Sequence, residues 1–287
     1  MAAAGACVGQ AVPDLQKAEG IILPMLARRD ARQRGARAKI DMLMSNATRQ
    51  LRASFIVRNF AWPYLKWRMT STARRGGRLR DMELQLRPIF QRLTKNTYHA
   101  NALRRAANAF ENIKEHLIGN DVLDLGAGNG LIAQMIQEHT SMKVTLADVI
   151  DYSIVQLPVI LFPQGGRIPM DDSSVDTVLI YLVLHHAAEP LQLLDEAVRV
   201  SRKRLIIMEG YIDDEDTRTV NCFLDWFLNR VVQGVDINLP LNFRTTVEWD
   251  RIFADRGLRV IKQDVVGVDE PIAPESHVLF VLDKQGD

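Results

Sequence analysis

Glycine occupies every second position in one short stretch near the middle of the chain, at Gly126, Gly128 and Gly130. An apolar segment that contains Asp124 precedes this stretch, and residues 131–139 have the apolar spacing of a helix. Because glycine has no β-carbon, it accepts a positive φ and lets a ligand approach the main chain. The free N–H groups at the start of the helix would point toward the same ligand. The stretch therefore predicts a strand, a binding loop and a helix.

The spacing of these residues argues against a dinucleotide ligand. The dinucleotide pattern Gly-x-Gly-x-x-Gly requires a glycine where this chain has Leu131. The pattern present is Asp-x-Gly-x-Gly-x-Gly, and its carboxylate suits a cationic ligand. It resembles motif I of the class I S-adenosylmethionine-dependent methyltransferases. The resemblance implies that Asp124 faces the methionine amino group, and that the glycines let the backbone approach the amino acid and the ribose.

A second acid follows at a distance that suits a nucleoside. Residues 143–148 read as an apolar strand ending at Asp148, where a parallel second strand would place a carboxylate beside a ribose. Gln164 stands where the family commonly has an acid that contacts the adenine amino group, and its carbonyl can accept the same hydrogen bond. The resemblance thus implies a cofactor site made of Asp124, Gly126, Ala127, Gly128, Gly130, Asp148, Val149, Gln164 and Leu182.

A histidine pair ends the predicted fourth strand. The apolar run 177–184 leads into His185 and His186, and Leu-His-His here is similar to the family's fourth motif. Each histidine is a candidate for proton transfer, although a positioning role is favoured. Since neighbouring side chains on a strand point to opposite sides, the pair is not expected to bind one ion, and no metal is predicted. Glu209, after the fifth strand, is the third catalytic candidate, facing the substrate or capping the next segment.

The order of the predicted elements agrees with the fold that the resemblance implies. The resemblance covers roughly residues 120–283 and includes Ile168-Pro169, which replaces the family's Leu-Pro. It implies an α/β, Rossmann-like, doubly wound sheet of seven strands, the last antiparallel, and the sequence supplies seven strand-like segments. Residues 119–287 are therefore expected to form an S-adenosylmethionine-dependent methyltransferase domain. In-line displacement at the sulfonium methyl would depend mainly on proximity and orientation.

Charge divides the chain into two parts. Residues 1–118 carry 22 Lys or Arg against 8 Asp or Glu, whereas the remaining residues carry 14 against 27. We predict a basic helical N-terminal region over residues 1–118 that acts as a lid or an interface, either meeting a polyanionic surface or docking on the acidic part. Only Cys7 and Cys222 occur, which excludes a disulfide framework and is typical of a reducing compartment.

Residues 55–80 interleave aromatic residues with Lys and Arg and contain no acid. This composition suits peripheral contact with an anionic membrane. Packing on the acidic part is an equal alternative, and nucleic-acid binding is less favoured. No apolar run has the length of a spanning helix, and a cytoplasmic location, with possible contact at a membrane surface, is expected. The oligomeric state is not predicted.

The motifs do not specify the methyl acceptor. The chain has Leu182–His186 where nucleic-acid amino methyltransferases carry Asn-Pro-Pro-Tyr or a similar segment, which disfavours a DNA or RNA base. Residues 217–232 are apolar nearly all round, as in a core helix or the wall of an apolar pocket. A small hydrophobic acceptor such as a quinone, a lipid or a polyketide-like molecule is favoured. The competing interpretation is a non-catalytic, methyltransferase-like protein that binds membrane or nucleic acid through its basic aromatic arm.

Overall fold

The computed structural model describes six parts of the chain, residues 15–27, 35–42, 62–95, 98–237, 239–266 and 276–285. Two features noted in the sequence, residues 55–61 of the aromatic segment and Cys7, lie outside the described residues.

A seven-stranded sheet forms the centre of the larger unit, with the strand order β3-β2-β1-β4-β5-β7-β6. The strands are β1 (Asp121–Leu125), β2 (Lys143–Asp148), β3 (Val159–Leu161), β4 (Val175–Tyr181), β5 (Ser201–Gly210), β6 (Leu258–Val266) and β7 (His277–Lys284). Strands β1 to β5 pair in parallel, whereas β7 runs antiparallel to both of its neighbours. The predicted Rossmann-like, doubly wound sheet with an antiparallel last strand is confirmed.

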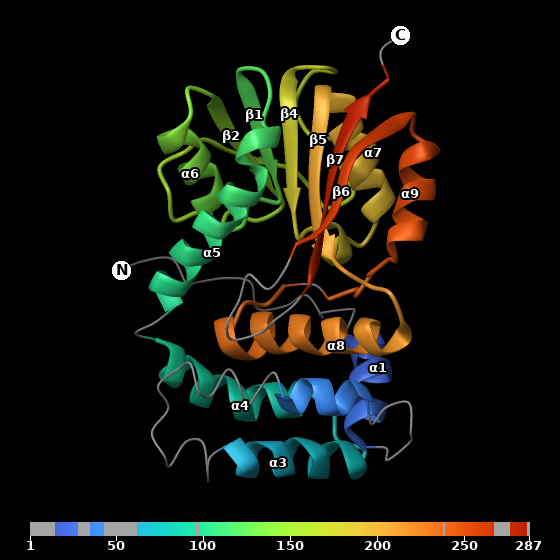
Figure 1. Cartoon of the computed structure of the whole chain (residues 1–287). Coiled ribbons are helices and arrows are strands. Elements are labelled where there is room, and N and C mark those ends of the chain that lie inside the picture. Colours follow the sequence, from blue (N-terminus) through green and yellow to red (C-terminus); the bar gives the residue numbers. More distant parts are fainter. Residues whose placement is uncertain are drawn as a thin grey trace.

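Helices cover both faces of the sheet (Figure 1). The helices α5 (Tyr98–Ile113) and α6 (Leu131–His139) share one apolar cluster with side chains from β1, β2 and β4. On the other face, α7 (Pro190–Val200) and α9 (Thr246–Ala254) share a second cluster with the same sheet. Because both faces are covered, β4 is buried from Val175 to Ile180, which explains its continuous apolar sequence.

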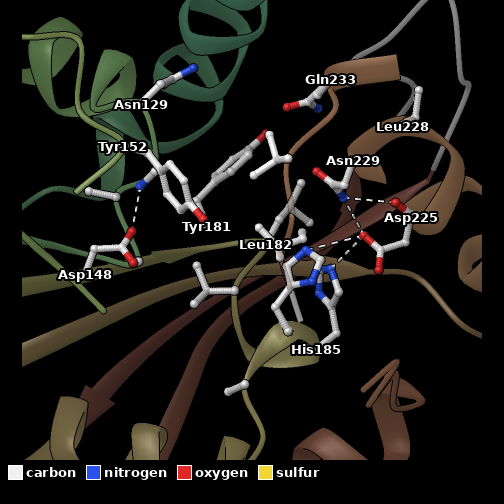
Figure 2. Close-up of a pocket in the computed structure, with 18 of the residues that line it drawn as sticks. Asn129, Asp148, Tyr152, Tyr181, Leu182, His185, Asp225, Leu228, Asn229 and Gln233 are labelled. Atoms are coloured by element: carbon white, nitrogen blue, oxygen red, sulfur yellow. Dashed lines mark hydrogen bonds and ion pairs between the residues drawn. The ribbon is translucent and has the colours of Figure 1, made fainter. Parts of the chain in front are cut away.

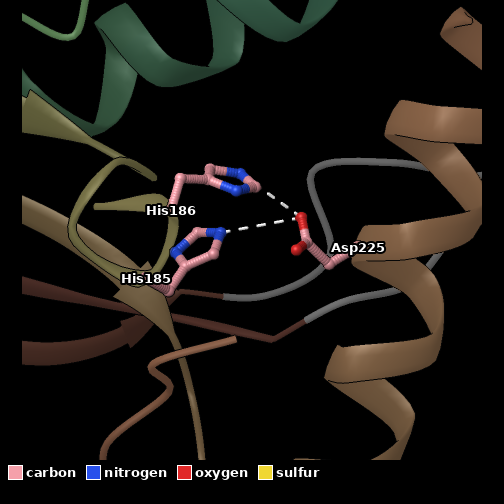
Figure 3. A group of neighbouring side chains, drawn as sticks. All are labelled: His185, His186 and Asp225. Carbon is pink, nitrogen blue, oxygen red and sulfur yellow. Dashed lines mark ion pairs between the residues drawn. The ribbon is translucent and has the colours of Figure 1, made fainter. Parts of the chain in front are cut away.

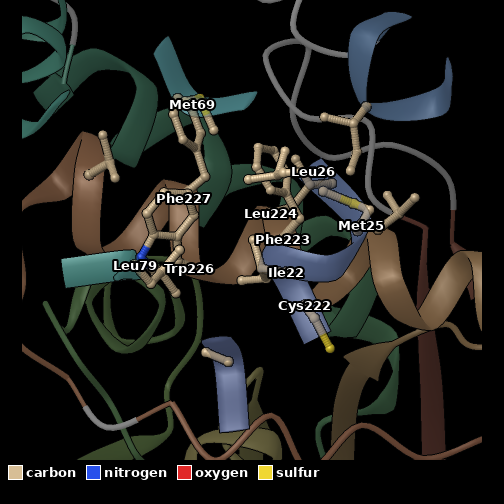
Figure 4. Packing of buried hydrophobic residues seen from close by; sticks show 14 of the residues in the cluster. Ile22, Met25, Leu26, Met69, Leu79, Cys222, Phe223, Leu224, Trp226 and Phe227 are labelled. Carbon is tan, nitrogen blue, oxygen red and sulfur yellow. The ribbon is translucent and has the colours of Figure 1, made fainter. Parts of the chain in front are cut away.

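A second group of helices packs at the carboxyl end of the strands, and we call it the helical cap (Figure 1). It contains α1 (Leu15–Ala27), a helical segment at 35–42, α3 (Trp62–Arg74), α4 (Leu79–Thr94), α8 (Glu215–Asp225) and the π-helix η4 (Trp226–Gln233). The cap has its own apolar core, in which Ile22 and Met25 of α1 pack with Phe223 and Trp226 (Figure 4). Two segments that are distant in the sequence therefore form one hydrophobic unit.

A buried ion pair also joins these two segments. Glu83 of α4 and Arg230 of η4 are both fully buried, and the Arg230 Nε lies 3.1 Å from the Glu83 Oε2. Arg87 donates to the Glu83 Oε1 at 2.7 Å and to the main-chain oxygen of Arg230 at 2.9 Å. Asp236 lies 3.3 Å from Arg230 and 2.9 Å from Arg87. The N-terminal helices are thus fixed to the segment that follows β5.

The helix α4 runs continuously from Leu79 to Thr94 and contains Pro88. One local expectation needs correction. The fourth strand ends at Tyr181, because Leu182 adopts a positive φ of 57° and donates its N–H to the Met208 carbonyl at 2.8 Å. The residues after it leave the direction of the strand.

Candidate active site

One large cavity, of about 650 Å³, lies between the carboxyl edge of the sheet and the helical cap. The glycine loop and the ends of β2 and β4 line one side, to which Asp148 and Tyr181 contribute (Figure 2). The other side is formed by α8 and η4, from which Asp225, Leu228 and Asn229 face the cavity. A cofactor on the loop and a second molecule under the cap would share this space.

The three glycines of the loop have different roles. All three have a positive φ, of 75° at Gly126, 54° at Gly128 and 76° at Gly130. A β-carbon at Gly126 would lie 2.5 Å from the Val183 side chain, and one at Gly130 would lie 2.6 Å from that of Val155. At Gly128 a β-carbon would meet nothing within 4 Å. Gly126 and Gly128 line the cavity, whereas Gly130 allows close packing behind the loop.

Asp148 is placed at the cavity by the end of β2 and braces the glycine loop. Its Oδ2 accepts the Gly128 N–H at 2.9 Å, and its Oδ1 accepts the Val149 N–H at 2.7 Å. Four other members of the predicted cofactor set also line the cavity, namely Ala127, Val149, Gln164 and Leu182. The sheet edge therefore brings together seven of the nine predicted cofactor residues.

Asp124 lies below the loop instead of facing the cavity. Its side chain is only 2% exposed, and it is absent from the cavity lining, as is Gly130. Burial, together with the nearby negative charge of Asp148, raises the pKa of Asp124 to about 7. A positive charge placed over the loop would favour the ionised form.

The histidine pair differs from the sequence expectation. Leu184–His186 form a short 3₁₀ turn, η3, and both imidazoles point to the same carboxylate, that of Asp225 (Figure 3). The Asp225 Oδ1 lies 3.3 Å from the His186 Nε2 and 3.7 Å from the His185 Nε2. The argument against a shared ion assumed a strand, and it fails because the strand has already ended at Tyr181.

Glu209 lies behind His185 and outside the cavity lining. Its Oε2 is 2.6 Å from the His185 Nδ1, and its Oε1 accepts the Leu184 N–H at 2.8 Å. The ring of Phe243 stacks on the His185 ring with centroids 4.6 Å apart. Glu209 therefore orients His185 and holds the turn, and it does not face a substrate directly.

Electrostatic interactions within this cluster oppose the effect of burial. Burial disfavours the protonated imidazole of His185, but Glu209 and Asp225 outweigh it and raise the pKa of His185 to about 10. Burial likewise favours the neutral acid at Asp225, yet the two histidines hold the pKa of that carboxyl below its usual value. Without a ligand, His185 is therefore a proton donor at neutral pH.

Sequence reasoning missed two polar residues of the site. Asp225 and Asn229 project from α8 and η4 into the cavity, and the Asn229 Nδ2 donates to the Asp225 Oδ1 at 2.8 Å. Both belong to the segment 217–232, which was described only by its apolar character. An acid within such an apolar segment was the available sequence signal.

Comparison with known proteins identifies the class. Residues 123–207 match the family described as a methyltransferase domain. A Thermotoga maritima S-adenosylmethionine-dependent methyltransferase is 16% identical, with a TM-score of 0.50 over 69% of this chain and 99% of that chain. A second from Aquifex aeolicus is 21% identical (60% and 87% covered, TM-score 0.43), and one from Methanosarcina mazei is 14% identical (61% and 97%, TM-score 0.47). No curated protein shows a match to the chain.

The matched residues span the glycine loop, Asp148 and the histidine turn, and the likeness to solved structures shows the fold. The chain therefore carries a methyltransferase domain with the fold of the class I S-adenosylmethionine-dependent enzymes, and S-adenosylmethionine is its cofactor.

Proposed function

We propose that this methyltransferase transfers the methyl group to a small, mainly apolar acceptor that carries a polar group at one end. The observation that supports this most directly is the single cavity that joins the glycine loop to α8 and η4. Donor and acceptor can meet inside it, away from bulk water. In this proposal the predicted domain boundary at residue 118 is modified, because the wall of the acceptor site contains helices from both sides of that boundary.

The cofactor is proposed to lie on the glycine loop. Asp148, at the end of β2, would accept hydrogen bonds from the ribose hydroxyls, and the exposed Gln164 would accept one from the adenine amino group; both residues line the cavity. The open space over Gly128 lets the amino-acid part approach the main chain. Asp124 would stabilise the positive methionine group from below the loop.

The acceptor is proposed to lie under the helical cap. Apolar side chains from the cap line this part of the cavity: Phe90, Leu224, Phe227, Leu228 and Val232. His185, His186 and Asp225 form a polar cluster beside this apolar wall. An acceptor with an apolar body and one polar group, such as a quinone, a lipid or a polyketide-like molecule, fits this division.

The reaction is in-line displacement at an activated methyl group, so positioning is the main task of the protein. In the free enzyme His185 is protonated at neutral pH and paired with Glu209 and Asp225, so it does not serve there as a general base. His186 faces the cavity beside it. Glu209 is a positioning residue, because it reaches the cavity only through His185.

The acceptor of this enzyme is further proposed to come from an anionic membrane surface. In the cap, α3 packs on α1 and α4 through Leu65 and Met69, and its outer side exposes Tyr64 (54%) and Trp67 (57%). The two rings lie 5.9 Å apart. Exposed aromatic rings among cations suit lipid headgroups. Within the described part of the chain, no helix combines the length and apolar character needed to cross a membrane.

Calorimetric titration with S-adenosylmethionine, and separately with NAD, tests the cofactor site. We expect binding of the first alone, and we expect Asp148→Ala to weaken it by about 1–3 kcal/mol, or about 5- to 150-fold, through lost hydrogen bonds. The exposed Asp171 provides the control, because Asp171→Ala leaves the cavity unchanged. Equal affinities of Asp148→Ala and the unaltered enzyme would refute this placement.

Transfer of label from methyl-labelled S-adenosylmethionine to lipid and quinone extracts tests the acceptor side. Val232→Trp should fill the acceptor space beside η4. It should therefore lower methyl transfer at least tenfold, while S-adenosylmethionine affinity stays within twofold. Val247→Trp, at an exposed position on α9 outside the cavity, is the matched control. Full transfer by Val232→Trp would show that the acceptor lies elsewhere.

A further inference from the structure

Three potential metal ligands converge on one point beside the acceptor part of the cavity. His185 and His186 come from η3, and Asp225 comes from the end of α8 (Figure 3). One ligand atom from each lies within 4.8 Å of the other two. The cluster therefore joins the sheet unit to the helical cap.

The separations in this cluster differ from those of charged hydrogen bonds. The Asp225 Oδ1 lies 3.3 Å from the His186 Nε2 and 3.7 Å from the His185 Nε2, whereas charge-assisted hydrogen bonds are about 2.7–2.9 Å long. Ligands bound tetrahedrally at about 2.1 Å are separated from one another by about 3.4 Å. The two Asp225–histidine separations are close to this value, and all three ligand atoms lie within 4.8 Å of one another.

Outer contacts hold two of the three groups in orientation. Glu209 occupies the His185 Nδ1 at 2.6 Å, which directs the Nε2 toward Asp225. Asn229 donates to the Asp225 Oδ1 at 2.8 Å. The Asp225 Oδ2 is buried and has no hydrogen-bond partner within the described residues, although the whole side chain is only 7% exposed. A carboxylate behind a metal-bound histidine is the arrangement found at protein metal sites.

The metal-ligand cluster is covered by protein on one side and opens toward the cavity on the other. All three residues line the cavity, and the side chain of His186 is 22% exposed there. Three protein ligands leave at least one coordination position free for a small molecule, as in catalytic and not structural zinc sites. That position faces the space assigned to the acceptor.

We propose that His185, His186 and Asp225 bind one divalent transition-metal ion of the zinc type, and that this ion holds a hydroxyl oxygen of the methyl acceptor. The proposal rests on the proposed function, since it defines the acceptor as an alcohol, a phenol or an enol. Two imidazoles and one carboxylate are ligands that suit Zn²⁺.

The methyl transfer then balances as follows. The metal-bound hydroxyl releases its proton to solvent water, because the positive ion lowers its pKa. The resulting oxygen anion attacks the methyl carbon of S-adenosylmethionine, forming the O–C bond. The S–C bond breaks with its electron pair on sulfur, which gives S-adenosylhomocysteine and the methyl ether.

Metal binding is tested with the full chain, first stripped with a chelator and then titrated with Co²⁺ and with Zn²⁺. We expect one Co²⁺ per chain with visible absorption bands, displaced by Zn²⁺. His186→Ala and Asp225→Asn should each weaken Zn²⁺ binding at least 100-fold. The exposed His139, on α6 and outside the cavity, provides the control His139→Ala. Thermal unfolding of each variant verifies that it is folded.

Absence of Co²⁺ bands, or unchanged Zn²⁺ affinity in folded His186→Ala, would overturn the metal proposal. Titration of the metal-free enzyme with S-adenosylmethionine distinguishes failure of the metal proposal from failure of the proposed function. If the stripped enzyme binds the cofactor and methylates a hydroxyl acceptor at its full rate, the metal inference fails and the proposed function stands. If the metal binds but no apolar acceptor is methylated, the proposed function fails instead.

Discussion

Substitution of Glu83 by glutamine should separate the stability of the helical cap from cofactor binding. Glu83 receives bonds from Arg80, Arg87 and Arg230, and neither Glu83 nor Arg230 is accessible to solvent. Among the described residues, Glu83→Gln would leave Asp236, which is 57% exposed, as the one acidic partner of these three guanidinium groups. Removing one partner of a buried pair costs about 3–5 kcal/mol. Because Asp236 remains, we expect a loss of about 3 kcal/mol, or about 6–12 °C in Tm.

Urea unfolding followed by tryptophan fluorescence measures this loss, since Trp226 lies in the cap core. Glu111→Gln is the matched control, because Glu111 is 63% exposed and pairs with Lys114 at 2.7 Å, so about 0.5 kcal/mol or less is expected. The double substitution Glu83→Met with Arg230→Met should recover much of the loss, since no unpaired charge remains at those two sites. S-adenosylmethionine affinity should stay within threefold. A loss below about 1 kcal/mol for Glu83→Gln would refute the assigned role of the ion pair.

Three further results are expected. Cofactor affinity should rise between pH 6 and pH 8, and binding should release a proton, because the pKa of Asp124 is about 7 and a cationic ligand favours its ionised form. Calorimetric titrations in two buffers detect the released proton, and Asp124→Asn should remove the effect. Gly126→Ala should destabilise the fold, as its β-carbon meets a side chain at 2.5 Å. Gly128→Ala, which has the same backbone strain but no steric contact, should destabilise it less and also weaken cofactor binding; thermal unfolding and calorimetry distinguish the two. Tyr64→Ser with Trp67→Ser should lower sedimentation with anionic vesicles but leave neutral vesicles unaffected, and equal sedimentation would contradict the membrane proposal.

The sheet could be predicted from the sequence because its signals are local. Continuous apolar runs marked the buried strands, as in β4, and the alternating glycines marked the loop. Asp148 followed from its spacing after the loop. These features depend on neighbouring residues, for which sequence patterns carry clear physical meaning. The fold and the cofactor edge could therefore be predicted from the sequence.

The site beside the cofactor was not accessible in the same way. The geometry of the histidine pair depends on Leu182, whose positive φ has no sequence signal because leucine rarely adopts it. The cap depends on contacts such as Glu83 with Arg230, which are 147 positions apart. Asp225 has a role in the site only because the folded chain brings the end of α8 next to η3. Long-range contacts of this kind decide which polar groups meet, and no local pattern records them.

The basic N-terminal region was expected to act as a lid or an interface, and its packing indicates how it affects the active site. Among the described N-terminal helices, α4 of the cap reaches the cavity with Phe90 and Thr94, and α5 of the sheet unit also contributes to the lining. The helices α1 and α3 contribute no residue to the lining. They instead bury the rear of α8 and η4, whose front carries Asp225 and the apolar acceptor wall. Because α8 and η4 could not bury their apolar rear alone, the N-terminal helices determine the position of Asp225 relative to η3, and through it the shape of the acceptor site.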